Sequence, residues 1–306
     1  MDGTRWITYQ RERFPLAAHA PLVAAFSFSA VSFSSVLRDR AAGPPSSSAI
    51  VAFVTSLAFF LQLRIADEFK DASEDARFRP YRPVPRGLVT LAELGTIGVA
   101  AAVLQAGLAL WLAPSLLVLL LPTWLYLWLM THEFFVPRWL RAHPVVYMAT
   151  HMLIVPFVDF YATACDWWVA GLRTPPAGLA WFLVVSFCNG LVIELGRKMR
   201  APEDEEVGVE TYSALWGPAG AALAWLAALV AAAACAVVTA IPLRTAIPLG
   251  VALAGLLGAC ATTARRFAAA PARADGRKFE ALSWVWTVSM YLTLGVLPLV
   301  MQQGGR

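Results

Sequence analysis

Long apolar runs separated by short polar segments set the pattern of this chain. Nine runs approach or reach the roughly 20 residues that a helix needs to cross the hydrocarbon core of a bilayer. The spans are expected at 16–37, 47–66, 91–112, 114–131, 145–165, 177–196, 217–241, 244–262 and 280–301. The pattern predicts an all-α, polytopic membrane protein, with one membrane domain over 1–306 and nine transmembrane helices around a central apolar cavity.

Composition supports a membrane protein and narrows its possible partners. The chain is 59% hydrophobic and 14% charged, whereas soluble domains carry about 25% charged residues. Residues 1–15 are polar and aromatic and lack the short apolar core of a cleavable signal. The four cysteines form no CxxC pair and are expected to be small buried thiols. We expect contact with membrane lipid, but neither nucleic acid nor an obligate protein partner.

The basic residues orient the predicted spans. Nineteen of the 24 Lys and Arg residues fall in segments that share one side of the membrane with the N-terminus. The other five are Arg38, Arg40, Arg173, Arg244 and Arg306. The positive-inside rule therefore predicts a cytoplasmic N-terminal segment, 1–15, and places the two polar loops at 67–90 and 197–216 on the same cytoplasmic side.

The first polar loop begins with a regular run of carboxylates, "DEFKDASED". Asp67, Asp71 and Asp75 are spaced four apart, so on a helix they share one face, with Glu68 beside them. Like charges at this spacing repel each other. Magnesium relieves such repulsion, and it commonly bridges one or two carboxylates to substrate phosphates. The run is interpreted as a magnesium site, although a solvated and charge-balanced loop has the same composition.

A proline-rich basic segment, "RFRPYRPVPRG", follows the carboxylates. Prolines at 80, 83 and 85 predict a stiff, extended backbone that fixes the directions of Arg79, Arg82 and Arg86. Planar guanidinium groups suit phosphate oxygens. Metal-binding and phosphate-binding groups thus adjoin an apolar bundle, which indicates a substrate with a diphosphate head and an apolar tail.

These residues resemble the first motif, NDxxDxxxD, of the UbiA superfamily of intramembrane prenyltransferases. Asp67 stands at the Asn and Glu68 at the first Asp, while Asp71 and Asp75 match directly. The stretch "RPYRPVPRGLV" is similar to the family's RPxxxG segment. The resemblance implies nine membrane helices, two or three Mg²⁺ ions and a prenyl diphosphate substrate, taken as C15 with C10 and C20 as alternatives.

The second family motif, DxxxD, is degenerate in this chain. The carboxylates available near it are Glu194, Glu203 and Asp204, and all three are predicted metal ligands together with the four acids of the first loop. Glu194 and Lys198 resemble a Glu and a Lys of archaeal lipid-forming members and are predicted to be catalytic, as are Asp71 and Asp75. Besides the three arginines of the first loop, the predicted diphosphate-binding residues are Arg197, Lys198 and Arg200.

The resemblance implies magnesium-assisted ionisation of an allylic prenyl diphosphate, and it leaves the fate of the cation open. The replaced start of the first motif and the lost Asp pair of the second favour intramolecular cyclisation to a terpene. The alternative is transfer of the prenyl group to an aromatic or lipid acceptor. A distant alternative is a divalent-cation transporter, which predicts a path of ionisable residues through mid-bilayer, whereas the acids here cluster at one membrane edge.

Isolated polar residues within the spans can have a functional or a structural role. Asp159 is an intramembrane acid and a functional candidate, or else an interfacial or hydrogen-bonded one. His132 and Glu133 lie within reach of the predicted site or are simply interfacial. His151 is interpreted as a hydrogen-bonded core histidine, and Asn189 as either facing the cavity or bridging helices.

Overall fold

Nine helices long and apolar enough to cross a membrane make up the computed structural model, which describes residues 3–39 and 43–304. No strand occurs in this part of the chain, so the predicted all-α bundle is confirmed. Arg40 and Arg306 lie outside the described residues. The spans are α2 (Leu16–Leu37), α3 (Ser46–Lys70), α5 (Leu91–Leu112), η1 with α6 (Pro114–Thr131), α8 with α9 (Pro144–Trp167), α10 (Leu179–Arg197), α11 (Tyr212–Ala240), α12 (Ala246–Ala269), and α13 with η4 and α14 (Asp275–Gln302).

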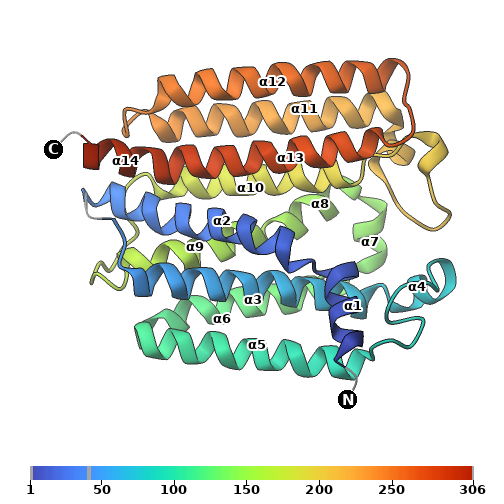
Figure 1. The fold of residues 1–306 in the computed structure, drawn as a ribbon, viewed down its shortest axis with the longest axis horizontal. Helices are drawn as coiled ribbons and strands as arrows, with labels where there is room; N and C mark the ends of the chain where they lie inside the picture. Colours follow the sequence, from blue (N-terminus) through green and yellow to red (C-terminus); the bar gives the residue numbers. More distant parts are fainter. Residues whose placement is uncertain (1–2, 40–42, 305–306) are drawn as a thin grey trace.

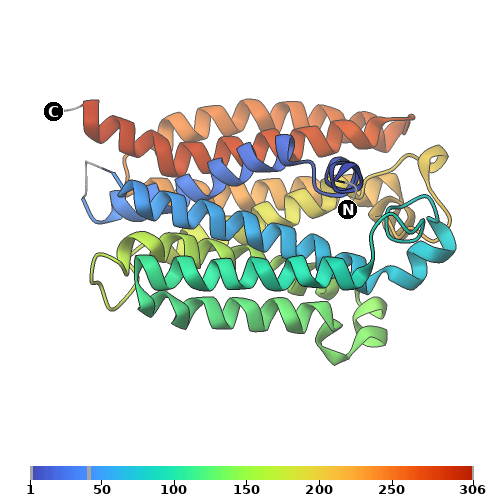
Figure 2. The same ribbon diagram turned by 60° about the horizontal axis from the view of Figure 1, so that its bottom comes forward.

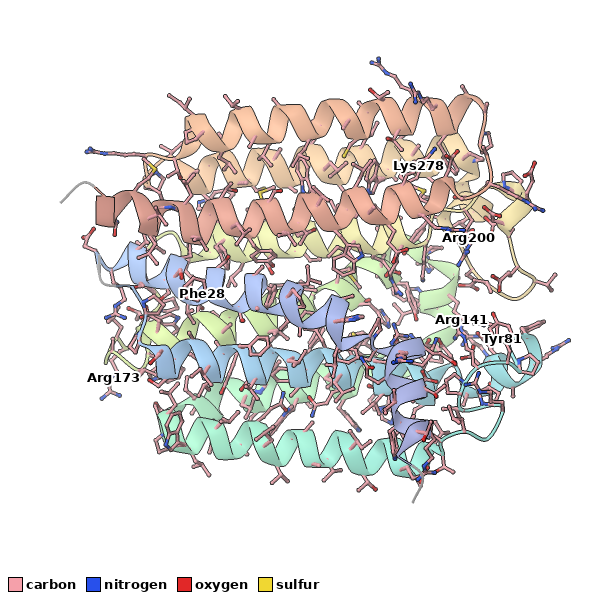
Figure 3. All side chains as sticks on the ribbon, viewed as in Figure 1. Phe28, Tyr81, Arg141, Arg173, Arg200 and Lys278 are labelled. Atoms are coloured by element: carbon pink, nitrogen blue, oxygen red, sulfur yellow. The ribbon has the colours of Figure 1, made fainter. Side chains whose placement is uncertain are left out.

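The helices run side by side, and the charged segments gather at one end of the bundle. Three short helices lie at that end: α1 (Thr4–Arg13), α4 (Ala72–Phe78) and α7 (Pro137–Ala142) (Figures 1 and 2). Figure 3 shows Tyr81, Arg141, Arg200 and Lys278 at this end and Arg173 at the other. We call it the charged end. That this end faces the cytoplasm stays a prediction.

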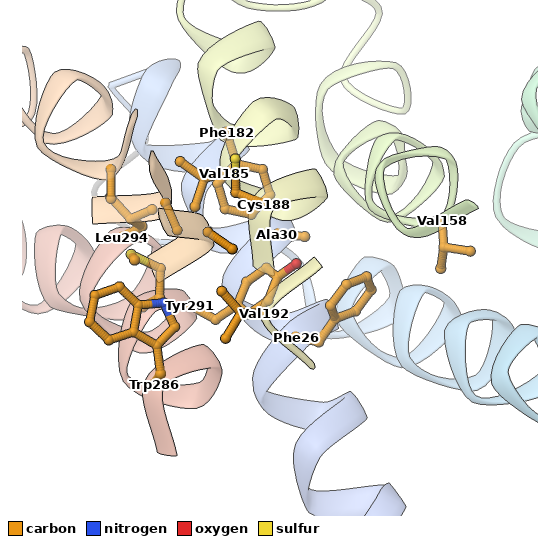
Figure 4. Packing of buried hydrophobic residues seen from close by; sticks show 14 of the residues in the cluster. Phe26, Ala30, Val158, Phe182, Val185, Cys188, Val192, Trp286, Tyr291 and Leu294 are labelled. Carbon is orange, nitrogen blue, oxygen red and sulfur yellow. The ribbon is translucent and has the colours of Figure 1, made fainter. Parts of the chain in front are cut away.

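Aromatic and small side chains fill the middle of the bundle. The Tyr291 ring lies 5.0 Å from that of Phe26 and 5.9 Å from that of Phe182 (Figure 4). A π-helical turn, η4 (Leu292–Val296), follows Tyr291, and its Gly295 lies against the backbone of Ser29 in α2. Small residues at such crossings allow membrane helices to approach closely. The central apolar cavity stays a prediction.

Asp159 ties three helices together in the apolar interior. It is fully buried on α9 (Ile154–Trp167), and its Oδ2 accepts a hydrogen bond of 2.7 Å from the Tyr291 hydroxyl of α13 (Asp275–Tyr291). The Tyr291 oxygen also lies 3.2 Å from the Ser186 hydroxyl of α10. Asp159 is therefore a buried, hydrogen-bonded residue, as one of its two interpretations expected. All four cysteines are free thiols; Cys165, Cys188 and Cys260 are buried as expected, whereas Cys235 is only partly buried.

Four helix boundaries at the charged end differ from the sequence prediction by four residues or more. The eighth span continues to Ala269 rather than 262, and the ninth begins at Asp275 rather than 280. The second span continues to Lys70 rather than ending at 66, which places Asp67 and Glu68 inside α3. The seventh begins at Tyr212 rather than 217, because the Thr211 hydroxyl caps it by accepting from the Ala214 N–H at 3.1 Å. A kink at Gly217 (φ +70°), directly before Pro218, separates this first turn from the apolar run.

Residues 4–13 of the predicted cytoplasmic segment form α1, which crosses α3 and α5 at the charged end (Figure 1). Three ion pairs hold it: Arg5 with Glu93 of α5 at 2.6 Å, Arg86 with Glu12 at 2.9 Å, and Arg13 with Glu68 of α3. An apolar pocket of about 450 Å³ lies beneath α1, between α3 and α5. The N-terminal helix is thus packed onto the bundle and fastened to the first acidic motif.

The contact between Gly295 and Ser29 predicts a steric cost for any side chain at 295. A Cβ there would lie 2.3 Å from the Ser29 carbonyl oxygen. Gly295→Ala should destabilise the protein by about 1–3 kcal/mol, as overpacking does. The matched control is Gly258→Ala in α12, where a Cβ meets nothing within 4 Å. Apparent melting temperatures in detergent check this; equal values for both variants would contradict the close packing of η4 on α2.

Candidate active site

The first acidic motif spans the junction of α3 and α4. Asp71 lies between the two helices, and i to i−4 backbone hydrogen bonds continue across it, from Asp71 N to Asp67 O at 2.9 Å and from Asp75 N to Asp71 O at 2.8 Å. The predicted helical spacing of these three aspartates is therefore kept through the junction. Their side chains nevertheless have different surroundings.

Asp75 is neutralised by two arginines that were predicted to bind diphosphate. It is buried, with 2% of its surface exposed, and pairs with Arg79 at 2.9 Å and Arg82 at 2.6 Å. The prediction of an extended proline segment is wrong, because residues 79–88 fold into successive turns with backbone bonds such as Arg86 N to Arg82 O at 3.0 Å. Proline's fixed φ suits turn positions as well as extended ones. The turns bring Arg79 and Arg82 into ion pairs with Asp75.

The other acids of the motif differ in how far basic side chains neutralise their charge. Glu68 is 2% exposed and bound by Arg13, whereas Asp67 makes one ion pair among the described residues, with Arg64 of its own helix at 3.5 Å. Asp71 makes no ion pair with any described residue. Burial, aided by repulsion from Asp67 and Asp75, raises the pKa of the Asp71 carboxyl above its usual value of 3.8, although Lys70 opposes the shift. Asp67 and Asp71 therefore form the carboxylate pair with the least internal compensation.

The end of α10 brings cationic groups toward this pair. Glu194 is buried and holds Arg197 at 2.5 Å and Lys198 at 3.0 Å. Arg197 lies near enough to Asp67 for the two charges to interact. Glu194 thus orients two predicted diphosphate-binding residues, and both of its oxygens are engaged.

The two acids of the second motif point toward a different part of the molecule. Asp204, in η3 (Pro202–Asp204), accepts a hydrogen bond from the Ala274 N–H at 2.9 Å, and Glu203 lies 3.7 Å from Arg273. Both contacts fasten the 198–211 loop to the connection between α12 and α13. A polar pocket of about 400 Å³ lies between these two loops, and Arg197 and Arg200 line it together with Glu203 and Asp204. The structure does not bring Glu203 and Asp204 together with Asp67 and Asp71.

The two predicted loops touch each other. Gly208, at φ +79°, packs against the Phe78 ring of α4, and a Cβ at this position would be 2.5 Å from that ring. The Tyr81 hydroxyl lies 3.4 Å from Glu206 of the second loop. Only glycine suits both the backbone conformation and the space at 208. The two loops, predicted to share one side of the membrane, are thus in direct contact.

Sequence reasoning missed a polar network beside the site. Lys70 Nζ donates to the Tyr147 hydroxyl at 2.7 Å, and that hydroxyl lies 3.5 Å from Glu133. Glu133 is buried and begins η2 (Glu133–Phe135), whose residues all have positive φ, while His132 is exposed. Lys70 lies within the quoted acidic run, but no local signal joins it to Tyr147, 77 residues away.

The acidic motif implies a magnesium ion, and the arrangement of the carboxylates determines whether they could hold one. No group of three His, Cys, Asp or Glu in the described part of the chain is arranged to hold an ion by itself. Asp67 and Asp71 nonetheless fit a magnesium ion that takes its remaining ligands from water and substrate phosphates, as magnesium usually does. Mutual repulsion within the acidic run is what a cation there would relieve.

Comparisons with known proteins agree with the sequence motifs. Residues 30–295 match the sequence profile of the UbiA prenyltransferase family. The fold is similar to the apo structure of a UbiA homolog from Aeropyrum pernix K1, with a TM-score of 0.64 and 16% identity over 93% of this chain and 98% of that one. A search of curated proteins finds no significant match.

The profile and the fold both extend over almost the whole chain, including the helix ends that carry the two loops. The predicted resemblance is therefore confirmed, and with it an integral membrane location. Membership of this family supports an enzyme that works within the membrane on prenyl diphosphates. This chain belongs to the UbiA prenyltransferase family.

Proposed function

We propose that the protein ionises an allylic prenyl diphosphate with the help of Mg²⁺ and that the resulting cation cyclises to a terpene. The observation that carries the ionisation step is that Asp67, one helical turn before Asp71, lies within electrostatic range of Arg197, which Glu194 holds together with Lys198 at one end of an apolar bundle. This end offers both signs of charge that a magnesium diphosphate requires.

Each set of residues has a separate role in this proposal. Asp67 and Asp71 hold the magnesium, which supplies positive charge to the departing diphosphate. Arg197 and Lys198, oriented by Glu194, bind diphosphate oxygens and stabilise the negative charge that grows as the C–O bond breaks. Apolar helices below hold the tail and keep water away from the cation.

The remaining predicted ligands require ion pairs to separate. Arg79 and Arg82 can reach diphosphate only if they release Asp75, which then becomes available to a second ion. Glu68 would similarly have to leave Arg13. We propose that binding of magnesium diphosphate exchanges these internal pairs for pairs with the ligand, with Arg86 remaining paired with Glu12 at the surface.

Cyclisation and prenyl transfer share the ionisation step and differ in what captures the cation. The degenerate second motif favours cyclisation, since Glu203 and Asp204 are engaged with the α12–α13 connection. The family name favours transfer to an aromatic or lipid acceptor. Incubation with Mg²⁺ and C10, C15 or C20 prenyl diphosphate, without any acceptor, separates the two. A cyclic hydrocarbon supports the cyclase, whereas diphosphate release only with an added acceptor contradicts it.

Loss of the Asp71 carboxylate should abolish most of the ionisation. Asp71→Asn is expected to lower magnesium-dependent diphosphate release on the order of 100-fold or more, because a charge that stabilises the leaving group is no longer held. Glu74→Gln is the matched control, since Glu74 is an exposed carboxylate of α4 that, among the described residues, pairs with Arg141 alone, at 3.4 Å. Equal rates for Asp71→Asn and the control would refute the magnesium assignment.

The raised pKa of Asp71 predicts a pH dependence for metal binding. A protonated carboxyl does not bind a cation, so the affinity for Mg²⁺ should fall as the pH drops through this raised pKa. The fall should begin at a higher pH than for an ordinary Asp, whose pKa is near 3.8. Titration calorimetry of Mg²⁺ binding with inorganic diphosphate, across a pH series, measures it. The pH dependence should be weaker in Asp71→Asn; an identical profile in that variant would contradict the prediction.

A further inference from the structure

His151 presents a buried ring nitrogen without a partner beside the proposed site. It lies on α8 (Pro144–Met152), is 7% exposed, and its Nδ1 is 2.8 Å from the Tyr147 carbonyl oxygen. A carbonyl only accepts, so Nδ1 carries the proton and Nε2 of the neutral ring keeps its lone pair. Nε2 is shielded from solvent and bonds to none of the described residues. Such an unpaired polar atom is costly in an apolar setting.

The ring is held rigidly by its neighbours. Tyr147 stacks on it with centroids 4.0 Å apart and planes 13° from parallel. Lys70 and Glu133 fix the Tyr147 hydroxyl in turn. Phe134 meets the imidazole edge-on at 6.2 Å, and its left-handed backbone (φ +51°, ψ +26°) is of the kind that is often retained at functional sites.

The depth of His151 suits a group that acts next to the diphosphate. It is one helical turn, about 6 Å, further into the bundle than Tyr147. It also lies within electrostatic range of Lys70, Glu194 and Asp67, which come from both sides of the proposed site. The ring therefore occupies the boundary at which a bound diphosphate head would give way to the hydrocarbon chain.

The facing helix contributes a second unsatisfied polar side chain. Asn189 of α10 is 1% exposed, and neither its amide nitrogen nor its amide oxygen has a described partner. Its neighbour Gly190 packs against α8, since a Cβ at 190 would lie 3.4 Å from the Met152 Cβ. The adjacent helices α8 and α10 thus each carry buried polar atoms without a described partner.

We propose that His151 Nε2 is the proton acceptor of the reaction, an assignment that rests on the proposed function. Ionisation sends the C–O electron pair out with diphosphate. In cyclisation, the final carbocation then loses a proton from the adjacent carbon to Nε2, and the C–H electron pair becomes the new C=C bond. In prenyl transfer, the proton comes from the acceptor at the atom that forms the new bond. Either route leaves a neutral product and an imidazolium, which returns its proton to water after release.

His151→Asn tests the proposal, with His143→Asn as its matched control. The asparagine amide can still donate to the Tyr147 carbonyl but offers no basic nitrogen at the Nε2 position. His143 has the same local geometry, with Nδ1 2.8 Å from the Trp139 carbonyl and a ring stacked on Trp139 at 4.5 Å, but it is exposed. Diphosphate release and organic products are measured together, without acceptor for cyclisation and with acceptor for transfer.

The proposal predicts that His151→Asn keeps diphosphate release within a few fold of the unsubstituted protein. Its yield of alkene or transferred product should fall on the order of 100-fold, with prenyl alcohol from water capture in its place. His143→Asn should be unchanged. In His151→Ala, added imidazole should restore the product, and failure of that rescue in folded protein would overturn the assignment.

Two outcomes separate this proposal from the proposed function. An unchanged product ratio in His151→Asn, or an equal loss of diphosphate release and product, overturns the role of His151 and leaves ionisation standing. The absence of diphosphate release from the unsubstituted protein overturns the proposed function itself.

Discussion

The pairing of buried carboxylates with basic side chains at the charged end is the constraint on which the rest of this structure depends. Glu68, Asp75 and Glu194 lie at the edge of an apolar bundle, and each is almost fully buried. An unpaired charge in such a position costs several kcal/mol. The chain compensates all three with Arg13, with Arg79 and Arg82, and with Arg197 and Lys198. The first pair joins α1 to α3, the second joins α4 to the turns that follow it, and the third lies within the end of α10.

The same constraint explains why a ligand of mixed charge suits this end. Breaking one buried pair by removing a partner destabilises a protein by about 3–5 kcal/mol, so carboxylates and arginines can part only if each gains a new partner. A magnesium diphosphate offers a cation to the acids and phosphate oxygens to the bases. In the proposed function, Asp67 and Asp71, the least compensated acids, receive the cation first.

The sequence predicted the features that depend on local pattern and missed those that depend on distant contacts. Apolar runs located all nine spans, because helix length and hydropathy are local properties. The four-residue spacing of Asp67, Asp71 and Asp75 survived at the junction of α3 and α4 for the same reason. No local signal indicated that Arg13 would reach Glu68, 55 residues away, or that Lys70 would reach Tyr147. The prediction of an extended proline segment was wrong because the fixed φ of proline permits turns as well as extended backbone. The ion pairs of Asp75 with Arg79 and Arg82 stabilise the turns.

Binding of a prenyl diphosphate that cannot ionise tests most directly whether the charged end holds a magnesium diphosphate. Purified protein in detergent can be titrated calorimetrically with a C15 thiodiphosphate, in the presence of Mg²⁺ and again with EDTA. The account predicts saturable binding with Mg²⁺ that is largely lost in EDTA, because the Asp67 and Asp71 carboxylates repel the diphosphate unless a cation lies between them. Equally tight binding in EDTA would contradict it.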